Sequence, residues 1–108
     1  MTDRELLELA AKAAGIEVWP GAGFQAHVLF TRPDLADPSG KVTGVAWNPL
    51  QDDGQALRLA VIVGLDQKLP HLLQGEAYRT DRFALGAFAA TRRAIVRAAA
   101  EIGKTRRD

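Results

Sequence analysis

Cysteine is absent from this chain, and serine and histidine are scarce. Without cysteine there are no disulfides, thiolate-bound metals, iron–sulfur clusters or cysteine nucleophiles. The one serine, Ser39, lies in a Pro-Ser-Gly turn, and the two histidines, His27 and His71, are isolated from each other in the sequence. A nucleophile needs a neighbouring base, and a metal site needs several ligands. We therefore predict no catalytic residue, no metal, no cofactor and no enzymatic activity.

Long apolar runs are also missing. No stretch approaches the ~20 apolar residues of a membrane span, and the first residues lack the basic and then apolar pattern of a signal peptide. A glycine-rich phosphate loop is missing too, because Gly21 and Gly23 are followed by neither a third glycine nor a Gly-Lys-Ser/Thr sequence. We expect a cytoplasmic protein that does not bind membranes.

Charge is divided unevenly along the chain, although the net charge is only +1. Residues 1–78 carry 6 basic and 10 acidic side chains, whereas residues 79–108 carry 8 basic and 3 acidic ones. The basic third of the chain is the natural place for an anionic partner. The alternative is that the two parts neutralise each other on the protein surface.

Two segments have both the apolar spacing and the end signals of a helix. The first covers residues 3–14, after the capping residue Thr2 and before a glycine. The second ends before Gly64 and begins at a cap, for which we prefer Asp52 to Asn48 because the apolar stripe starts only after Asp52. Both segments predict amphipathic helices with one buried face.

A third helix is predicted near the C-terminus, ending at Gly103 as its left-handed cap. Its basic and acidic residues repeat at helical spacing on the side opposite to its apolar residues, which predicts an exposed charged face. The predicted apolar face consists of Phe88, Thr91, Ile95, Ala98, Ala99 and Ile102. The predicted charged face consists of Arg93, Arg97, Glu101 and Lys104.

Alternating and β-branched patterns predict strands elsewhere. Residues 16–19 and 24–30 are predicted to form a hairpin, and residues 41–47 a third strand after a loop at 32–40. The pattern between residues 66 and 86 is weaker. Residues 68–73 are apolar but interrupted by proline, which indicates either an edge strand or an irregular segment.

The order of these elements predicts the fold class. A short strand at residues 76–80 completes the series of three helices and a small sheet. Amphipathic helices and a small antiparallel or mixed sheet bury their apolar faces by stacking in layers. We predict a single α+β domain over residues 1–104, resembling an αβα sandwich, followed by a frayed basic tail at 105–108.

Three stretches of the sequence carry a resemblance to a known family. They cover residues 2–15, residues 47–61 around Trp-Asn-Pro-Leu and Asp-Asp-Gly, and residues 90–103. Together they resemble short proteins encoded by tailed phages and prophages, similar in layout to the phage αβα-sandwich family. The resemblance implies an accessory phage protein made in the bacterial host cytoplasm, and it carries no catalytic residues over.

The arginines of the third predicted helix are the main candidates for a binding site. Arg92, Arg93 and Arg97 lie close together, and a guanidinium holds phosphate or carboxylate through paired hydrogen bonds. Arg93 and Arg97 are separated by one helical turn and repel each other unless an anion or Glu101 relieves the repulsion. The alternatives are a solvated helix face or a structural pairing with Asp52 or Asp53.

Three other residues are included in the candidate site. Asp52 and Asp53 are the one adjacent carboxylate pair, and such pairs hold metals in phosphoryl chemistry, although a helix cap and a dipole partner explain them more simply. Trp47 offers a ring on which a ligand can stack, although tryptophans more often lie in the core or on a sheet face.

These observations favour a small, non-enzymatic, phage-encoded binding protein. Its expected partner is a host factor to be neutralised, either a defence protein or an anionic signal such as a nucleotide, and a homo-oligomer is left open. The alternative is a nucleic-acid-binding regulator, which the low net charge makes less favourable. That regulator would use Arg92, Arg93, Arg97, Lys104, Arg106 and Arg107.

Overall fold

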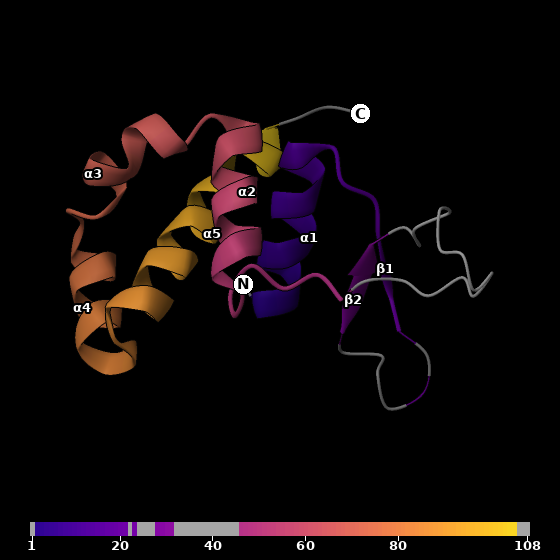
Figure 1. Cartoon of the computed structure of the whole chain (residues 1–108), viewed down its shortest axis with the longest axis horizontal. Coiled ribbons are helices and arrows are strands. Elements are labelled where there is room, and N and C mark those ends of the chain that lie inside the picture. The colour runs from indigo at the N-terminus through magenta and orange to yellow at the C-terminus, as the bar shows by residue number, and fades with distance from the viewer. Residues whose placement is uncertain (1, 22, 24–27, 32–45, 106–108) are drawn as a thin grey trace.

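The computed structural model describes residues 2–21, 23, 28–31 and 46–105 (Figure 1). In this part of the chain there are five helices and two paired strands, so the α+β class is confirmed, whereas the prediction of three helices is wrong and the αβα layering is not confirmed. The elements are α1 (Asp3–Ala14), β1 (Val18–Pro20), β2 (Leu29–Thr31), α2 (Asp53–Val63), the 3-10 turn η2 (Asp66–Lys68), α3 (Leu69–Leu72), α4 (Glu76–Leu85) and α5 (Ala87–Thr105).

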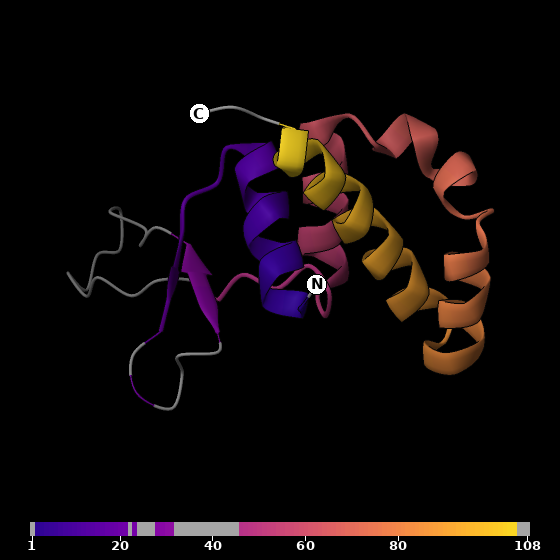
Figure 2. The ribbon, with the colours of Figure 1, turned by 180° about the vertical axis from the view of Figure 1, so that it is seen from behind.

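Helix α5 is the centre of the helical part. It lies between α4 on one side and α1 and α2 on the other, and both views agree on this arrangement (Figures 1 and 2). Many of the most completely buried side chains come from α1, α2 and α5, among them Ala10, Leu59 and Val96. Burial of such apolar surface is the main favourable contribution to folding.

The predicted bounds of the first two helices are confirmed, and the caps explain why. The side chains of Thr2 and Asp52 each accept a backbone N–H from three residues further on, at 3.2 and 2.8 Å. Gly15 and Gly64 follow the helices with φ of 71° and 79°, a left-handed conformation that glycine adopts without strain. Asn48, the alternative cap, instead accepts a hydrogen bond within the turn that precedes α2.

Helix α5 differs from its prediction in two respects. Gly103 does not end the helix but lies inside it, where α5 crosses α1 so closely that a Cβ would stand 2.0 Å from the carbonyl oxygen of Leu9. Phe88 is exposed rather than buried, whereas Val96 and Ala100, outside the predicted apolar face, are fully buried. The prediction assumed one buried face, but α5 has neighbours on several sides.

The predicted hairpin is confirmed in its antiparallel pairing, with Trp19 opposite Phe30. Of the predicted third strand, Ala46 forms an isolated antiparallel bridge to Phe30, and the backbone N–H of Trp47 donates to the carbonyl of Leu29 at 2.8 Å. The rest of that strand and the predicted loop at 32–40, which contains Ser39, lie outside the described residues. So do residues 24–27 of the predicted hairpin, which include His27.

The predicted strands between residues 66 and 86 are wrong, because this segment forms η2, α3 and α4. Pro70 lies in the first turn of α3, where a helix needs no N–H from it. Helix α4 is preceded by Gly75, and its one buried side chain is Tyr78. Alanine, arginine and leucine within this segment favour a helix over a strand.

Two further predictions concern the C-terminal tail and the absence of a membrane-spanning segment. Thr105, placed in the predicted tail, is the last residue of α5, while residues 106–108 lie outside the described part. Among the described helices, α5 is the longest, and neither it nor any other is apolar enough over sufficient length to cross a membrane.

Candidate functional site

The predicted site residues do not form one cluster. Trp47 is only 5% exposed and belongs to the core, which is the alternative that the sequence analysis weighed against ligand stacking. The Asp52 carboxylate is used as the cap of α2. The remaining predicted residues, Asp53 and the three arginines, take part in ion pairs between helices.

Arg92 fastens α5 to the start of α2. Its Nε donates to the carbonyl oxygen of Leu50 at 2.8 Å, and its Nη1 donates to Oδ1 of Asp53 at 2.6 Å. The Arg92 side chain is mostly buried, while that of Asp53 is largely exposed. The structural pairing of this arginine with Asp53, one of the alternatives weighed from the sequence, is therefore confirmed.

Arg93 and Arg97 reach two other helices. Nη2 of Arg93 donates to Oδ1 of Asp3 in α1 at 2.7 Å, and Nη1 of Arg97 donates to Oδ2 of Asp81 in α4 at 2.6 Å. Both guanidiniums are partly exposed. Although the two arginines are neighbours on α5, each is held by a carboxylate from a different helix, and this reduces their mutual repulsion.

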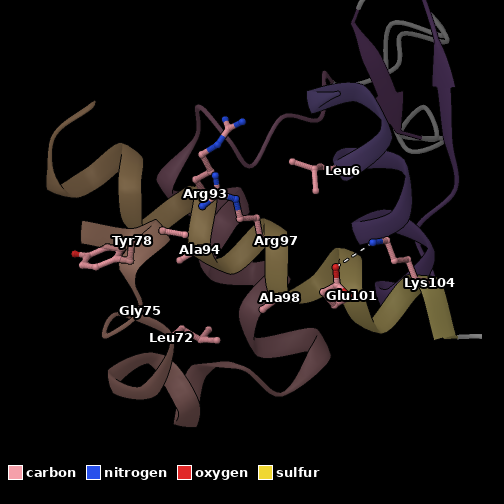
Figure 3. A pocket seen from close by; sticks show the side chains of 11 residues that line it. Leu6, Leu72, Gly75, Tyr78, Arg93, Ala94, Arg97, Ala98, Glu101 and Lys104 are labelled. Atoms are coloured by element: carbon pink, nitrogen blue, oxygen red, sulfur yellow. Dashed lines mark hydrogen bonds and ion pairs between the residues drawn. The ribbon is translucent and has the colours of Figure 1, made fainter. Parts of the chain in front are cut away.

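A groove lies beside these two arginines, on the surface of α5 between α1 and the α3–α4 segment. We call it the arginine groove, and its volume is about 540 Å³. Figure 3 shows Leu6 of α1 on one side, Leu72 on the other and the small side chains of Ala94 and Ala98 on the α5 floor between them. The lining residues are Leu6, Leu72, Gly75, Ala77, Tyr78, Arg93, Ala94, Arg97, Ala98, Glu101 and Lys104.

The arginine groove combines an apolar floor with positive charge. Three cations line it, and one of them, Lys104, pairs with Glu101 along α5 at 3.1 Å (Figure 3). Within the described part of the chain, Arg93 and Arg97 each make a single hydrogen bond, although a guanidinium carries several further N–H donors in a planar fork. These donors are able to bind an anion that enters the groove.

A second groove is lined by α2, by Leu69 of α3 and by the beginning of α5. We call it the Phe88 groove, and its volume is about 410 Å³. Its lining is mostly apolar, and Arg92 and Asp53 stand at its edge. The lining residues are Asp53, Ala56, Leu57, Leu69, Ala87, Phe88, Thr91, Arg92 and Ile95.

Tyr78 and Asp81 are site residues that the sequence analysis did not single out. Tyr78 lines the arginine groove, and Asp81 holds Arg97 beside it. Both come from the segment predicted as a strand, where residues three apart point in opposite directions. In a helix they share a face, so the spacing becomes a signal only once α4 is known to be helical.

No family model matches the chain, and comparison with curated proteins and with solved structures finds no similar protein. The resemblance to phage proteins therefore stays a prediction. In the described ranges, no three histidine, aspartate or glutamate side chains lie close enough together to hold a metal ion. Function is accordingly inferred from the grooves and from the charges that line them.

Proposed function

We propose that this protein binds a small organic anion in the arginine groove without transforming it. The observation that carries the proposal is the pair of guanidiniums on neighbouring turns of α5, each already holding a carboxylate at 2.6–2.7 Å. The Asp3 and Asp81 carboxylates do not line the groove, and each uses one donor of its guanidinium, so other N–H groups are left for a ligand carboxylate or phosphate. The negative charge of each carboxylate nevertheless opposes the binding of an anion to the same guanidinium.

The groove lining favours an anion attached to an apolar body. Leu6, Leu72 and Ala98 offer carbon surface beside the charged wall, and the groove volume lies within the range of small-molecule sites, about 300–1,000 Å³. An inorganic ion would leave this apolar surface in contact with water. A molecule that combines a phosphate or carboxylate with an aromatic or aliphatic body would cover both parts of the groove.

The biological target follows from the phage resemblance as part of the same proposal. A phage accessory protein acts in the cytoplasm of its host, where nucleotide signals combine a phosphate with an aromatic base. We propose such a host signal as the ligand, in preference to a defence protein. The nucleic-acid alternative has less support, because the net charge of the chain is only +1, whereas nucleic-acid-binding domains are strongly basic.

Calorimetric titration with AMP, adenosine and inorganic phosphate tests the proposal. AMP should bind more tightly than either fragment, because it alone covers both the charged wall and the apolar floor. Arg97→Gln should weaken AMP binding roughly tenfold or more, the usual loss for a charge-assisted hydrogen bond. Equal binding of AMP and adenosine, or no binding of AMP, would contradict the proposal.

A matched variant separates ligand binding from structural support. Asp81→Asn keeps the shape of the side chain but removes the competing charge from Arg97. If Arg97 binds the ligand, Asp81→Asn should strengthen AMP binding, while both substitutions lower the free energy of unfolding. If Arg97 has only a structural role, the two variants should change AMP binding in the same direction, and the proposal fails.

A further inference from the structure

Large apolar side chains are exposed where α4 meets α5. Phe83 is 96% exposed, Phe88 is 78% exposed and Leu85 is about half exposed, and all three lie close to Gly86, the residue between the two helices. Across the Phe88 groove, Leu57 on α2 is also more than half exposed. Exposed large apolar side chains that gather beside a groove often mark an interaction site.

The exposed surface is large enough for a protein interface. An aromatic side chain covers about 150–250 Å² when buried, so Phe83 and Phe88 together expose roughly 350 Å². Leu57, Leu85 and Val61, which lies one turn after Leu57 on the same face of α2, bring the apolar total to roughly 600 Å². A stable interface needs about 800 Å² from each partner, including its polar rim.

The shape of this surface suits a two-fold contact with itself. An exposed phenyl ring, Phe88, stands beside a hollow of about 410 Å³ with Ile95 among its lining residues. In a two-fold interface the same patch is used by both copies, so the ring of each copy can enter the hollow of the other. Phe88 suits such an exchange, because its ring lies at the edge of the hollow on its own copy.

The charges at the edge of the hollow do not oppose a contact between two copies. The acid and the base at this edge, Asp53 and Arg92, already pair with each other at 2.6 Å, so they neutralise each other within each copy. The net charge of the chain is only +1, and two copies therefore repel each other weakly.

We propose that a second copy of this chain occupies the Phe88 groove and forms a two-fold dimer in which the Phe88 rings are exchanged. The dimer does not depend on the proposed ligand, because the two grooves have no lining residue in common. It places two arginine grooves in one assembly.

Sedimentation velocity over a concentration series tests the dimer. The wild-type chain should pass from monomer to dimer between about 1 and 200 µM, a range that covers the affinities of modest interfaces. Phe88→Ser should weaken the dimer roughly thirtyfold or more, as expected for a central aromatic residue. Both Phe88 and Phe83 are exposed, so their replacement leaves the core intact, and circular dichroism should show unchanged helix content.

Trp19→Ser is the matched control, because Trp19 is an exposed aromatic residue on β1, at the opposite end of the molecule from α4 (Figure 1). This variant should dimerise like the wild type. A monomeric wild-type chain at 200 µM, roughly the upper end of this affinity range, would overturn the proposal and leave the surface to a different protein. Equal weakening by Trp19→Ser and Phe88→Ser would also overturn it.

Discussion

The three-helix core and the α3–α4 arm of this molecule are stabilised in different ways. In the core, α1, α2 and α5 bury small and aliphatic side chains against one another, and several are fully inaccessible to solvent. The arm covers residues 69–85, all of them described, and its one buried side chain is Tyr78. The core is thus held by many contacts, whereas the arm depends on very few.

The helix ends show the same contrast. Side chains cap the beginnings of α1 and α2, whereas α3 and α4 begin with no side-chain hydrogen bond. The arm is joined to the rest of the protein by Leu69 and Leu72, which are partly buried against the core, and by the Arg97–Asp81 ion pair. A region with few buried contacts opens locally at a lower free energy than the rest of the protein. The arginine groove therefore has one wall from the rigid core and one from the less stable arm.

The largest expected effect is that of Gly103→Ala. The new Cβ would stand 2.0 Å from the Leu9 carbonyl oxygen, so α1 and α5 must separate. We expect the free energy of unfolding to fall by about 3 kcal/mol, the upper part of the usual range for overpacking, despite the better helix propensity of alanine. Thermal unfolding measures the change. Gly75→Ala in the arm, where a Cβ meets nothing within 4 Å, should cost less than about 1 kcal/mol.

Tyr78→Ala should have a smaller and more local effect. Tyr78 is the one buried side chain of α4, so its loss exposes apolar surface that this helix otherwise shields from water. We expect amide hydrogen exchange in α4 to rise roughly tenfold or more, a change of at least about 1.4 kcal/mol, while exchange in α1 and α5 stays unchanged. Faster exchange throughout the protein would show that core and arm unfold together.

The same contrast explains which parts of the fold could be predicted from the sequence. Helices α1 and α2 carry local signals at both ends, a capping side chain at the start and a glycine at the end, and their predicted bounds agree with the structure. The arm lacks a side-chain cap and contains Pro70 within a short apolar run, which also fits an edge strand. Its helices follow from propensity and from contacts with α5 that are distant in the sequence.

The candidate site was predictable only in part, because its geometry depends on distant partners. The arginines of α5 were singled out from their chemistry, and the pairing of Arg92 with Asp53 was considered. Arg93, however, meets Asp3 at the other end of the chain, and no local pattern indicates that contact. The exposed position of Phe88 and the close crossing at Gly103 likewise depend on how several helices surround α5.

Gly75→Asp should have the smallest effect. It gives α4 the kind of side-chain cap with which α1 and α2 begin. Gly75 precedes α4 in an extended conformation and supplies no side chain to cap the helix. An aspartate there can accept a backbone N–H of the first turn, as Asp52 does for α2, and its charge favours the positive end of the helix dipole. We expect a gain of about 0.5 kcal/mol, measured as slower amide exchange in α4. Gly75→Ala should instead give a loss, because alanine has no capping side chain either and is less favourable than glycine at this position. If aspartate and alanine change exchange in α4 equally, the missing cap does not explain why the arm is less stable than the core.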